Sequence, residues 1–505
     1  MSNDYLERIL KARVYDVAIE SPLEHAPRLS RRLGNTVLFK REDMQPVFSF
    51  KIRGAYNKIA HLSETAAGRG VICASAGNHA QGVALAARKR GIKATIVMPL
   101  TTPQIKVQAV IDFGGEAVLH GDDYDQAYEH ALSLARERQL TFIHPFDDPD
   151  VIAGQGTIGV EILRQCPGEQ IDAIFVGVGG GGLISGIAAY VKHLFPQIRI
   201  IGVEPEDADA MHQSLRERRR ITLDRVGTFA DGVAVRRVGE EPFRLAQQYV
   251  DEVILVSNDE ICAAIQDIFE DNRAIVEPAG ALSVAGIKKY VARENCRERT
   301  FVGINCGANM NFDRLRHVVE RADIGGYREA LIAVEIPEEK GSFLRFCATL
   351  GRRSVTEFNY RYNEGGPAHI FVGLALSEGR KEKEAIIATL KNAAYPVLDM
   401  SENEMAKLHV RYMVGGHARI PHERLFRFEF PERPGALGKF LDAIGTQWNI
   451  TLFHYRNHGS DYGRVLAGVQ IPPGESVDFD LHVRELKYVY SEETDNPAYR
   501  MFLGG

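Results

Sequence analysis

Short apolar runs recur along the first two-thirds of the chain and are separated by small or helix-forming residues. The runs lie at residues 71–73, 94–98, 171–178 and 301–305, and residues 35–40 are predicted to form a further short strand. Runs of this kind are typical of strands that are buried on both faces of a parallel sheet. Helix-forming residues follow two of them, at 83–88 and 184–192. The alternation predicts βαβ units and therefore an α/β fold with parallel sheets.

One loop of interest lies between the strand at 71–73 and the helix at 83–88, and it contains Ser75, Gly77 and Asn78. Ligands of parallel sheets bind at the carboxyl ends of the strands, where this loop falls. Its backbone N–H groups at a helix N-terminus suit an anion such as a substrate carboxylate. His79 is a candidate general base, but a histidine at a helix start more often caps or packs, and packing is the favoured interpretation.

A second loop holds four consecutive glycines, 179–182, followed by Leu183. Consecutive glycines let backbone N–H groups converge on a phosphate, aided by the dipole of the helix that follows. Residues 177–182 also match the dinucleotide fingerprint, and Glu204 stands near the place of a ribose-binding acid. The loop alone leaves a dinucleotide and a simple phosphate ester equally open. A further helix is predicted to begin at Thr157.

Lys51 stands beside Phe48 and Phe50 and before the small-residue segment 53–55. An amine beside apolar rings is partly desolvated, which lowers its pKa and leaves part of it neutral and nucleophilic near pH 7. A Schiff-base lysine needs this property. A solvated lysine at the start of a helix is an equally good interpretation of this stretch by itself.

Length and composition exclude several classes of protein. A chain of 505 residues predicts about three domains. A net charge of −6 argues against nucleic acid or an anionic membrane as the partner. Six dispersed cysteines without a Cys-x-x-Cys pair indicate reduced thiols, and the first residues lack a signal or transit pattern, so a cytoplasmic location is expected. Residues 173–191 carry no charge, but their four glycines favour strand, loop and helix over a membrane span.

These segments together resemble the fold-type II pyridoxal phosphate enzymes, and most closely the biosynthetic threonine deaminase (threonine ammonia-lyase) family. Six segments follow the family's order and approximate spacing: residues 40–56, 75–82, 179–183, 231–235, 277–281 and 306–309. Any one of them is a weak signal, whereas six in order are a strong one. The resemblance implies a catalytic domain of two doubly wound parallel-sheet subdomains with pyridoxal 5'-phosphate as cofactor.

By this resemblance Lys51 is the catalytic residue and forms the Schiff base, Asn78 hydrogen-bonds the ring oxygen of the cofactor, and Cys306 stands beside its pyridine nitrogen. The implied cofactor-binding residues are Phe50, Lys51, Asn78, Gly179, Gly180, Gly181, Gly182, Leu183 and Cys306. The implied substrate-binding residues are Ser75, Gly77 and His79.

A neutral thiol at Cys306 cannot stabilise a protonated ring as a carboxylate would, which suits β-elimination and suits transamination poorly. Lys51 is then expected to remove the Cα proton, after which the β-hydroxyl leaves and a 2-oxo acid and ammonia result. Some relatives bind a divalent cation through a Glu, a carbonyl four residues on and an Asp six residues on. Glu204 and Ala208 match, but position 210 is Ala, so no metal is expected.

The chain repeats itself beyond about residue 327. The matching pairs are Pro337 and Pro431 and Gly341 and Gly435 at an offset of 94, and residues 356–361 and 451–456 at an offset of 95. Each copy predicts strand, Pro/Gly turn, helix, strand, strand. The pattern resembles paired α+β ACT-like domains, which implies inhibition by isoleucine, opposed by valine. A duplicated assembly domain without a ligand is the alternative.

The expected organisation is a catalytic domain at 1–326 and two ACT-like domains at 327–413 and 414–505, in a homotetramer by resemblance. The expected substrate is L-threonine, with L-serine also accepted. A serine-preferring dehydratase of the same fold type is the nearest alternative. From other classes, a nicotinamide oxidoreductase built on residues 177–182 and a catalytically silent amino-acid sensor remain open.

Overall fold

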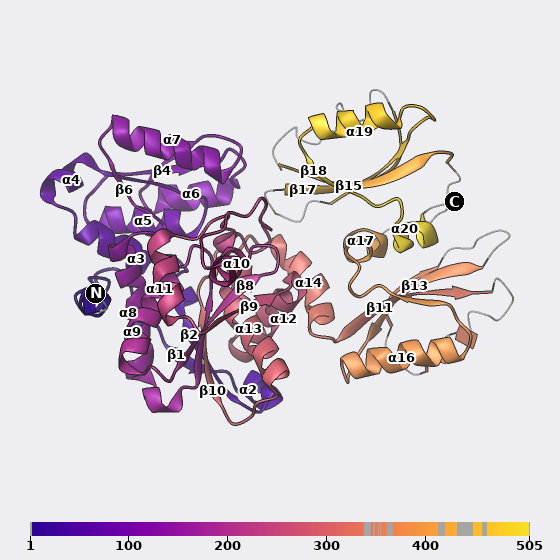
Figure 1. Cartoon of the computed structure of the whole chain (residues 1–505), viewed down its shortest axis with the longest axis horizontal. Coiled ribbons are helices and arrows are strands. Elements are labelled where there is room, and N and C mark those ends of the chain that lie inside the picture. The colour runs from indigo at the N-terminus through magenta and orange to yellow at the C-terminus, as the bar shows by residue number, and fades with distance from the viewer. Residues whose placement is uncertain are drawn as a thin grey trace. The chain divides into compact units, whose positions relative to one another are not determined.

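The computed structural model of the protein describes residues 3–337, 345–346, 349–351, 353, 355–360, 367–412, 420–431, 448–456 and 462–503. The chain forms two compact units, Met1–Phe312 and Asp313–Gly505. The first unit contains a six-stranded and a four-stranded sheet, and the second unit contains two four-stranded sheets (Figure 1). The predicted domain boundaries at residues 326 and 413 stay predictions.

The six-stranded sheet of the first unit has the order β1-β2-β10-β7-β8-β9. All neighbouring strands are parallel except the edge pair β1 and β2. The strands are β1 Leu23–His25, β2 Thr36–Arg41, β7 Ala173–Gly177, β8 Arg199–Pro205, β9 Glu252–Val256 and β10 Thr300–Asn305. Every residue of β7 is buried, as its uniformly apolar sequence predicts.

The four-stranded sheet has the order β5-β4-β3-β6 and is parallel throughout. Its strands are β3 Val71–Ala74, β4 Ala94–Met98, β5 Glu116–Leu119 and β6 Thr141–Phe142. The predicted βαβ unit is present as β3, a helix and β4. Two parallel sheets in one unit confirm the α/β fold class.

Thirteen α-helices accompany these sheets within the described part of the first unit. They are α1 Asn3–Leu10, α2 Pro27–Leu33, α3 Lys51–Ala60, α4 Glu64–Arg69, α5 Asn78–Lys89, α6 Gln104–Asp112, α7 Tyr124–Glu137, α8 Pro149–Gln165, α9 Gly182–Leu194, α10 Ala210–Glu217, α11 Glu240–Tyr249, α12 Asn258–Asn272 and α13 Pro278–Glu294. The predicted start of a helix at Thr157 is wrong, because α8 begins two turns earlier. Asp148 caps it by accepting hydrogen bonds from the backbone N–H groups of Asp150 and Val151, and Pro149 occupies its first position.

Helices α3 and α8 approach each other at two glycines. A Cβ atom on Gly154 would lie 2.7 Å from the Cα of Gly54. A Cβ atom on Gly54 would lie 2.4 Å from the amide of Gln155. Backbones can come this close only where no side chain intervenes. The contact fixes the position of α3, whose first residue is Lys51.

The uncharged window at 173–191 is divided among β7, a glycine loop and α9, as its composition predicts. In the part of the chain that the structure describes, no helix combines the length and the apolar character that crossing a membrane requires.

The second unit contains two sheets of the same antiparallel design, ordered β12-β13-β11-β14 and β16-β17-β15-β18. Register shifts fall at equivalent places, between Val355 and Glu357 and between Ile450 and Leu452. The elements are α14 Arg314–Gly325, β11 Glu329–Ile336, β12 Val355–Tyr360, β13 Ala368–Ala375, α16 Arg380–Asn392, β14 Val397–Asp399, α17 Glu404–Leu408, β15 Glu423–Pro431, β16 Asn449–Arg456, β17 Tyr462–Gln470, α19 Ser476–Glu485, β18 Val489–Glu492 and α20 Pro497–Phe502. The internal repeat is therefore confirmed.

Among the described residues, α16 packs on the sheet of the first repeat and α19 packs on the sheet of the second (Figure 1). A shared core joins the two repeats and includes Leu331 and Leu425, with α17 and α20 contributing to it. The predicted Pro/Gly turns, with Gly341 and Gly435, lie outside the described residues.

Candidate active site

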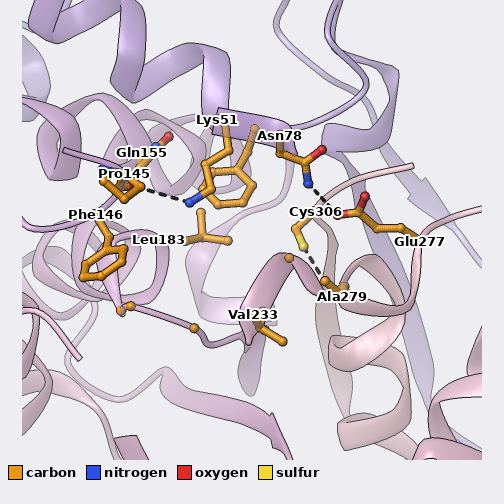
Figure 2. A pocket seen from close by; sticks show the side chains of 17 residues that line it. Lys51, Asn78, Pro145, Phe146, Gln155, Leu183, Val233, Glu277, Ala279 and Cys306 are labelled. Atoms are coloured by element: carbon orange, nitrogen blue, oxygen red, sulfur yellow. Dashed lines mark hydrogen bonds between the residues drawn. The ribbon is translucent and has the colours of Figure 1, made fainter. Parts of the chain in front are cut away.

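One cavity of the first unit brings together most of the residues singled out in the sequence (Figure 2). The predicted residues that line it are Phe50, Lys51, Asn78, Gly179, Gly180, Gly181, Gly182, Leu183 and Cys306. They come from both parallel sheets and from segments more than 250 positions apart in the sequence. The fold therefore assembles the lysine, the glycine loop and the thiol in a single place.

Lys51 projects into this cavity from the first turn of α3. Its Nζ donates a hydrogen bond to the carbonyl oxygen of Pro145 at 3.2 Å and lies 5.2 Å from the ring centroid of Phe50. Burial lowers the pKa of Lys51 to about 8, although the neighbouring Cys306 and Glu277 side chains oppose this fall. About a tenth of this amine is therefore neutral and nucleophilic at pH 7.

The four glycines of the second loop leave no room for side chains. A Cβ atom on Gly180 would lie 2.1 Å from the ring of Phe146, and one on Gly179 would lie 2.9 Å from the Cα of Val233. Gly181 has a φ of +93°, a conformation that favours glycine, and α9 begins directly after it. A bare backbone at a helix N-terminus is suited to a phosphate. The lysine and this loop together fit an aldehyde cofactor that carries a phosphate group.

Cys306 follows β10 and is buried. Its Sγ lies 3.3 Å from the carbonyl oxygen of Ala279. Burial, reinforced by the negative charge of Glu277, raises the pKa of the Cys306 thiol far above its ordinary value. The side chain therefore stays a neutral thiol at physiological pH.

Asn78 is held by two partners that the sequence did not connect with it. Its Nδ2 donates to Glu277 Oε1 at 2.6 Å, and its Oδ1 accepts from Asn309 Nδ2 at 2.6 Å. The backbone N–H of Asn309 donates to Glu277 Oε2 at 3.0 Å. Burial, and next the charge of Asp231, raise the pKa of Glu277 to about 7, although both N–H donors oppose this rise.

The predicted substrate-binding loop surrounds Asn78 in the sequence, and Asn78 lines the cavity. Ser75, Gly77 and His79 are not among the described residues that line it. The Oγ of Ser75 accepts a hydrogen bond from the N–H of Gly77. His79 is buried with its Nε2 2.8 Å from the carbonyl oxygen of Ile143, and burial lowers its pKa to about 3. This geometry agrees with the packing interpretation of His79, and the substrate contacts stay predictions.

Sequence reasoning missed the segment 144–147, which forms one wall of the cavity through Pro145 and Phe146. The Nδ1 of His144 accepts hydrogen bonds from the backbone N–H groups of Phe146 and Asp147, which holds the turn in place. The segment follows β6, so its place at the carboxyl end of a parallel strand was a usable signal. Glu277 also lines the cavity; it lies in the matched segment 277–281, but the sequence assigned it no role. Gln155, a further lining residue, lacked such a signal.

Glu204, considered as a ribose or cation ligand, has a different use. It is fully buried and accepts hydrogen bonds from the N–H groups of Met211 and His212, at the start of α10. Burial raises its pKa to about 8. Among the described residues, no group of three or more acidic, histidine or cysteine side chains is arranged to hold a metal ion.

Comparison with known proteins gives two family matches. A model described as "Pyridoxal-phosphate dependent enzyme" matches residues 14–307. A model described as "C-terminal regulatory domain of Threonine dehydratase" matches twice, at residues 320–410 and 414–503.

Individual relatives match over the whole chain. The biosynthetic L-threonine dehydratase of Burkholderia multivorans is 56% identical over 99% of both chains, and that of Escherichia coli is 54% identical over 99% of this chain and 97% of its own. The solved structure of the processed form of threonine deaminase isoform 2 from Solanum lycopersicum matches with a TM-score of 0.62 and 52% identity. That match covers 64% of this chain and 93% of the other.

Proposed function

The chain belongs to the family of pyridoxal-phosphate-dependent biosynthetic threonine dehydratases, and on this premise we propose which residues perform the reaction and which effectors control it. The enzyme is a threonine ammonia-lyase with C-terminal regulatory domains. It converts L-threonine to 2-oxobutanoate and ammonia. One observation carries the assignment of residues: the Lys51 amine and the Gly179–Gly182 loop line the same buried cavity.

Lys51 is the residue that moves protons in this proposal. The bound cofactor draws electrons away from the substrate Cα, which makes the Cα–H bond acidic. The Lys51 amine, with its pKa lowered to about 8, takes this proton at Nζ. The carbonyl oxygen of Pro145, 3.2 Å away, keeps Nζ inside the cavity and orients it.

The remaining cavity residues bind and select. The glycine loop at the start of α9 binds the phosphate of the cofactor. The neutral thiol of Cys306 contributes no negative charge, so the cavity favours rapid loss of the substrate β-hydroxyl over transamination. The buried lining of Phe50, Leu183 and Val233 excludes water from these steps.

The test of Lys51 has a matched control on the same helix, the half-buried Lys58, which pairs with Asp148 and Asp150 at the start of α8. Lys51→Ala is expected to lose measurable 2-oxobutanoate formation from threonine, whereas Lys58→Ala retains it. Full turnover by Lys51→Ala would refute the assigned role. Steady-state comparison of threonine with serine separates this enzyme from a serine-preferring dehydratase, since a single methyl group is worth about 10-fold to 200-fold in kcat/KM.

The two repeats of the second unit are proposed to bind amino-acid effectors, with isoleucine inhibiting and valine opposing it. The support is the duplicated sheet order and the double match to a threonine dehydratase regulatory domain. Isoleucine must bind a low-activity arrangement better than the active one, and threonine must then weaken isoleucine binding by the same factor. Isoleucine should shift the threonine saturation curve to higher concentrations, and valine should shift it back. An unchanged curve would remove the regulatory proposal but not the catalytic one.

Three further parts of the proposal concern organisation. We propose a cytoplasmic homotetramer, which light scattering on the purified enzyme tests. We also propose that residues 1–326 form the catalytic domain and that 327–413 and 414–505 form the regulatory domains. Limited proteolysis tests these boundaries, since cleavage should concentrate near residues 326 and 413.

A further inference from the structure

The amide of Asn78 is fixed at both of its polar atoms. Asn78 opens α5 after β3, Glu277 precedes α13, and Asn309 follows β10. The three side chains therefore come from elements of both parallel sheets of the first unit. The side chains of Asn78 and Glu277 line the cavity that holds Lys51 (Figure 2), and Asn309 joins them through its hydrogen bonds to both residues.

The hydrogen bonds of these side chains allow one orientation of the Asn78 amide. The ionised form of Glu277, which both N–H donors favour, only accepts, so it requires the Nδ2 side of the amide. Asn309 Nδ2 donates both to the carbonyl oxygen of Val47 and to Asn78 Oδ1, so it requires the oxygen side. Both oxygens of Glu277 accept N–H groups, one from Asn78 and one from the backbone of Asn309. The second hydrogen of Asn78 Nδ2 has no part in these contacts.

The backbone around the side chains of Asn78 and Glu277 packs closely against them and leaves no room for further side-chain atoms. A Cβ atom on Gly307 would lie 2.6 Å from Glu277 Oε1 and 3.2 Å from Asn78 Nδ2. A Cβ atom on Gly232 would lie 3.2 Å from the same carboxylate oxygen. Two separate segments therefore carry glycine where they enclose the Asn78–Glu277 hydrogen bond. This enclosure is independent of the hydrogen bonds themselves.

We propose that Glu277 and Asn309 are positioning residues that hold Asn78 so that its remaining N–H points into the cavity toward the ring oxygen of the cofactor. The inference rests on the proposed function and on the contact of Asn78 with the ring oxygen, which the family resemblance of the sequence implies. Neither residue exchanges a proton with the substrate in this proposal. Their effect reaches the cofactor through Asn78 alone.

The test is a double-mutant cycle on the purified full-length enzyme. The variants are Asn78→Ala, Glu277→Gln and the double variant, with Glu204→Gln as a control for loss of a buried carboxylate away from the cavity. The readouts are the dissociation constant for added pyridoxal 5'-phosphate and the visible absorption band of the bound cofactor without substrate. Glu277→Gln retains the shape of the side chain but places an NH₂ group against one of the two N–H donors.

Glu277→Gln is expected to weaken cofactor binding about 10-fold, the effect of losing one hydrogen bond to a charged group, and to shift the absorption band. Glu204→Gln should leave both readouts unchanged. The double variant should match Asn78→Ala, because Glu277 has nothing to position once the amide is gone. Additive losses in the double variant, or an unchanged band in Glu277→Gln, would overturn the proposal.

Asn309→Asp provides a second test that does not depend on Glu277→Gln folding. Aspartate cannot donate to Asn78 Oδ1, so the same band shift and a similar weakening of cofactor binding are expected, and an unshifted band would again overturn the proposal. The outcome is separable from the proposed function. A wild-type enzyme that binds the cofactor but forms no 2-oxobutanoate from threonine would contradict the function, while the cycle would still decide the roles of Glu277 and Asn309.

Discussion

The guanidinium group of Arg53 lies 2.6 Å from the carboxylate of Glu161, and neither side chain has any exposed surface. Arg53 also pairs with Glu42 at 2.8 Å, and Lys40 pairs with Glu161 at 2.7 Å, again with no exposure. The four charges connect β2, the turn after it, α3 and α8. Arg53, at the centre of the network, lies two residues after Lys51 on α3. Buried charges are tolerated only when paired and hydrogen-bonded, so this network specifies how α3 sits in the fold.

Arg53→Met should be strongly destabilising, because it leaves Glu42 buried without its cation and Glu161 with one partner fewer. Loss of one partner in a buried pair costs about 3–5 kcal/mol. Arg164→Met is the control. It removes an exposed arginine of α8 that pairs with Glu20 and should leave the unfolding midpoint nearly unchanged. Denaturant unfolding of both variants measures the difference. Equal midpoints would mean that the network does not stabilise the fold.

The contact between α3 and α8 predicts opposite outcomes for two alanine substitutions. Gly154→Ala places a Cβ 2.7 Å from the carbonyl oxygen of Arg53, which should cost about 1–3 kcal/mol and lower kcat by displacing Lys51. Gly68→Ala, in α4, meets no atom within 4 Å and should be stabilising by about 0.5–1 kcal/mol. Thermal unfolding and threonine assays check both. A Gly154→Ala enzyme with wild-type stability would show that the helices can separate without cost.

Much of the first unit follows from the apolar runs, since a strand buried on both faces must be uniformly apolar. The strands at 94–98 and 301–305 appear in the fold within one residue of their predicted limits. The start of α8 was missed because the capping pair Asp148 and Pro149, rather than the apolar pattern, determines it. The burial of Arg53 could not be foreseen either, because arginine is almost never fully buried unless it is paired and its partners are distant in sequence.

The residues of the candidate site also differ in whether local sequence or distant contacts reveal them. Lys51 and the glycine loop could be located because their local sequences have a direct chemical meaning. Pro145 could not, and Glu277 was located in the matched segment 277–281 without a role. Both act through distant contacts, Pro145 with Lys51 across 94 positions and Glu277 with Asn78 across 199 positions. Single-sequence patterns report local conformation and burial, whereas such contacts depend on how the two parallel sheets are placed.

The lowered pKa of Lys51 predicts its reactivity in the cofactor-free enzyme. The rate of reductive methylation of Lys51, followed by mass spectrometry, should reach half of its maximum near pH 8, because only the neutral amine reacts. Lys58 of the same helix is the internal control, since hydrogen bonds to Asp148 and Asp150 outweigh its desolvation and raise its pKa. Its rate should still be rising above pH 10. If the two lysines followed the same pH profile, the amine of Lys51 would not be desolvated.

Glu204 predicts how stability depends on pH. Burial raises its pKa in the folded state to about 8, against about 4.3 for an unfolded glutamate. The folded state therefore binds the proton more tightly, and the stability from this group is fully present below pH 4 and is lost as the pH rises to about 8. The slope between these values is about 1.4 kcal/mol per pH unit.

Glu204→Gln removes this titration while leaving Glu277, whose pKa is also raised, in place. Between pH 6 and pH 8 the wild-type enzyme should lose about 2 kcal/mol more stability than the variant does. Denaturant unfolding at both pH values and at one protein concentration measures the two losses. Parallel losses would mean that Glu204 is already ionised in the folded state at pH 6. The N–H groups of Met211 and His212 would then outweigh its burial.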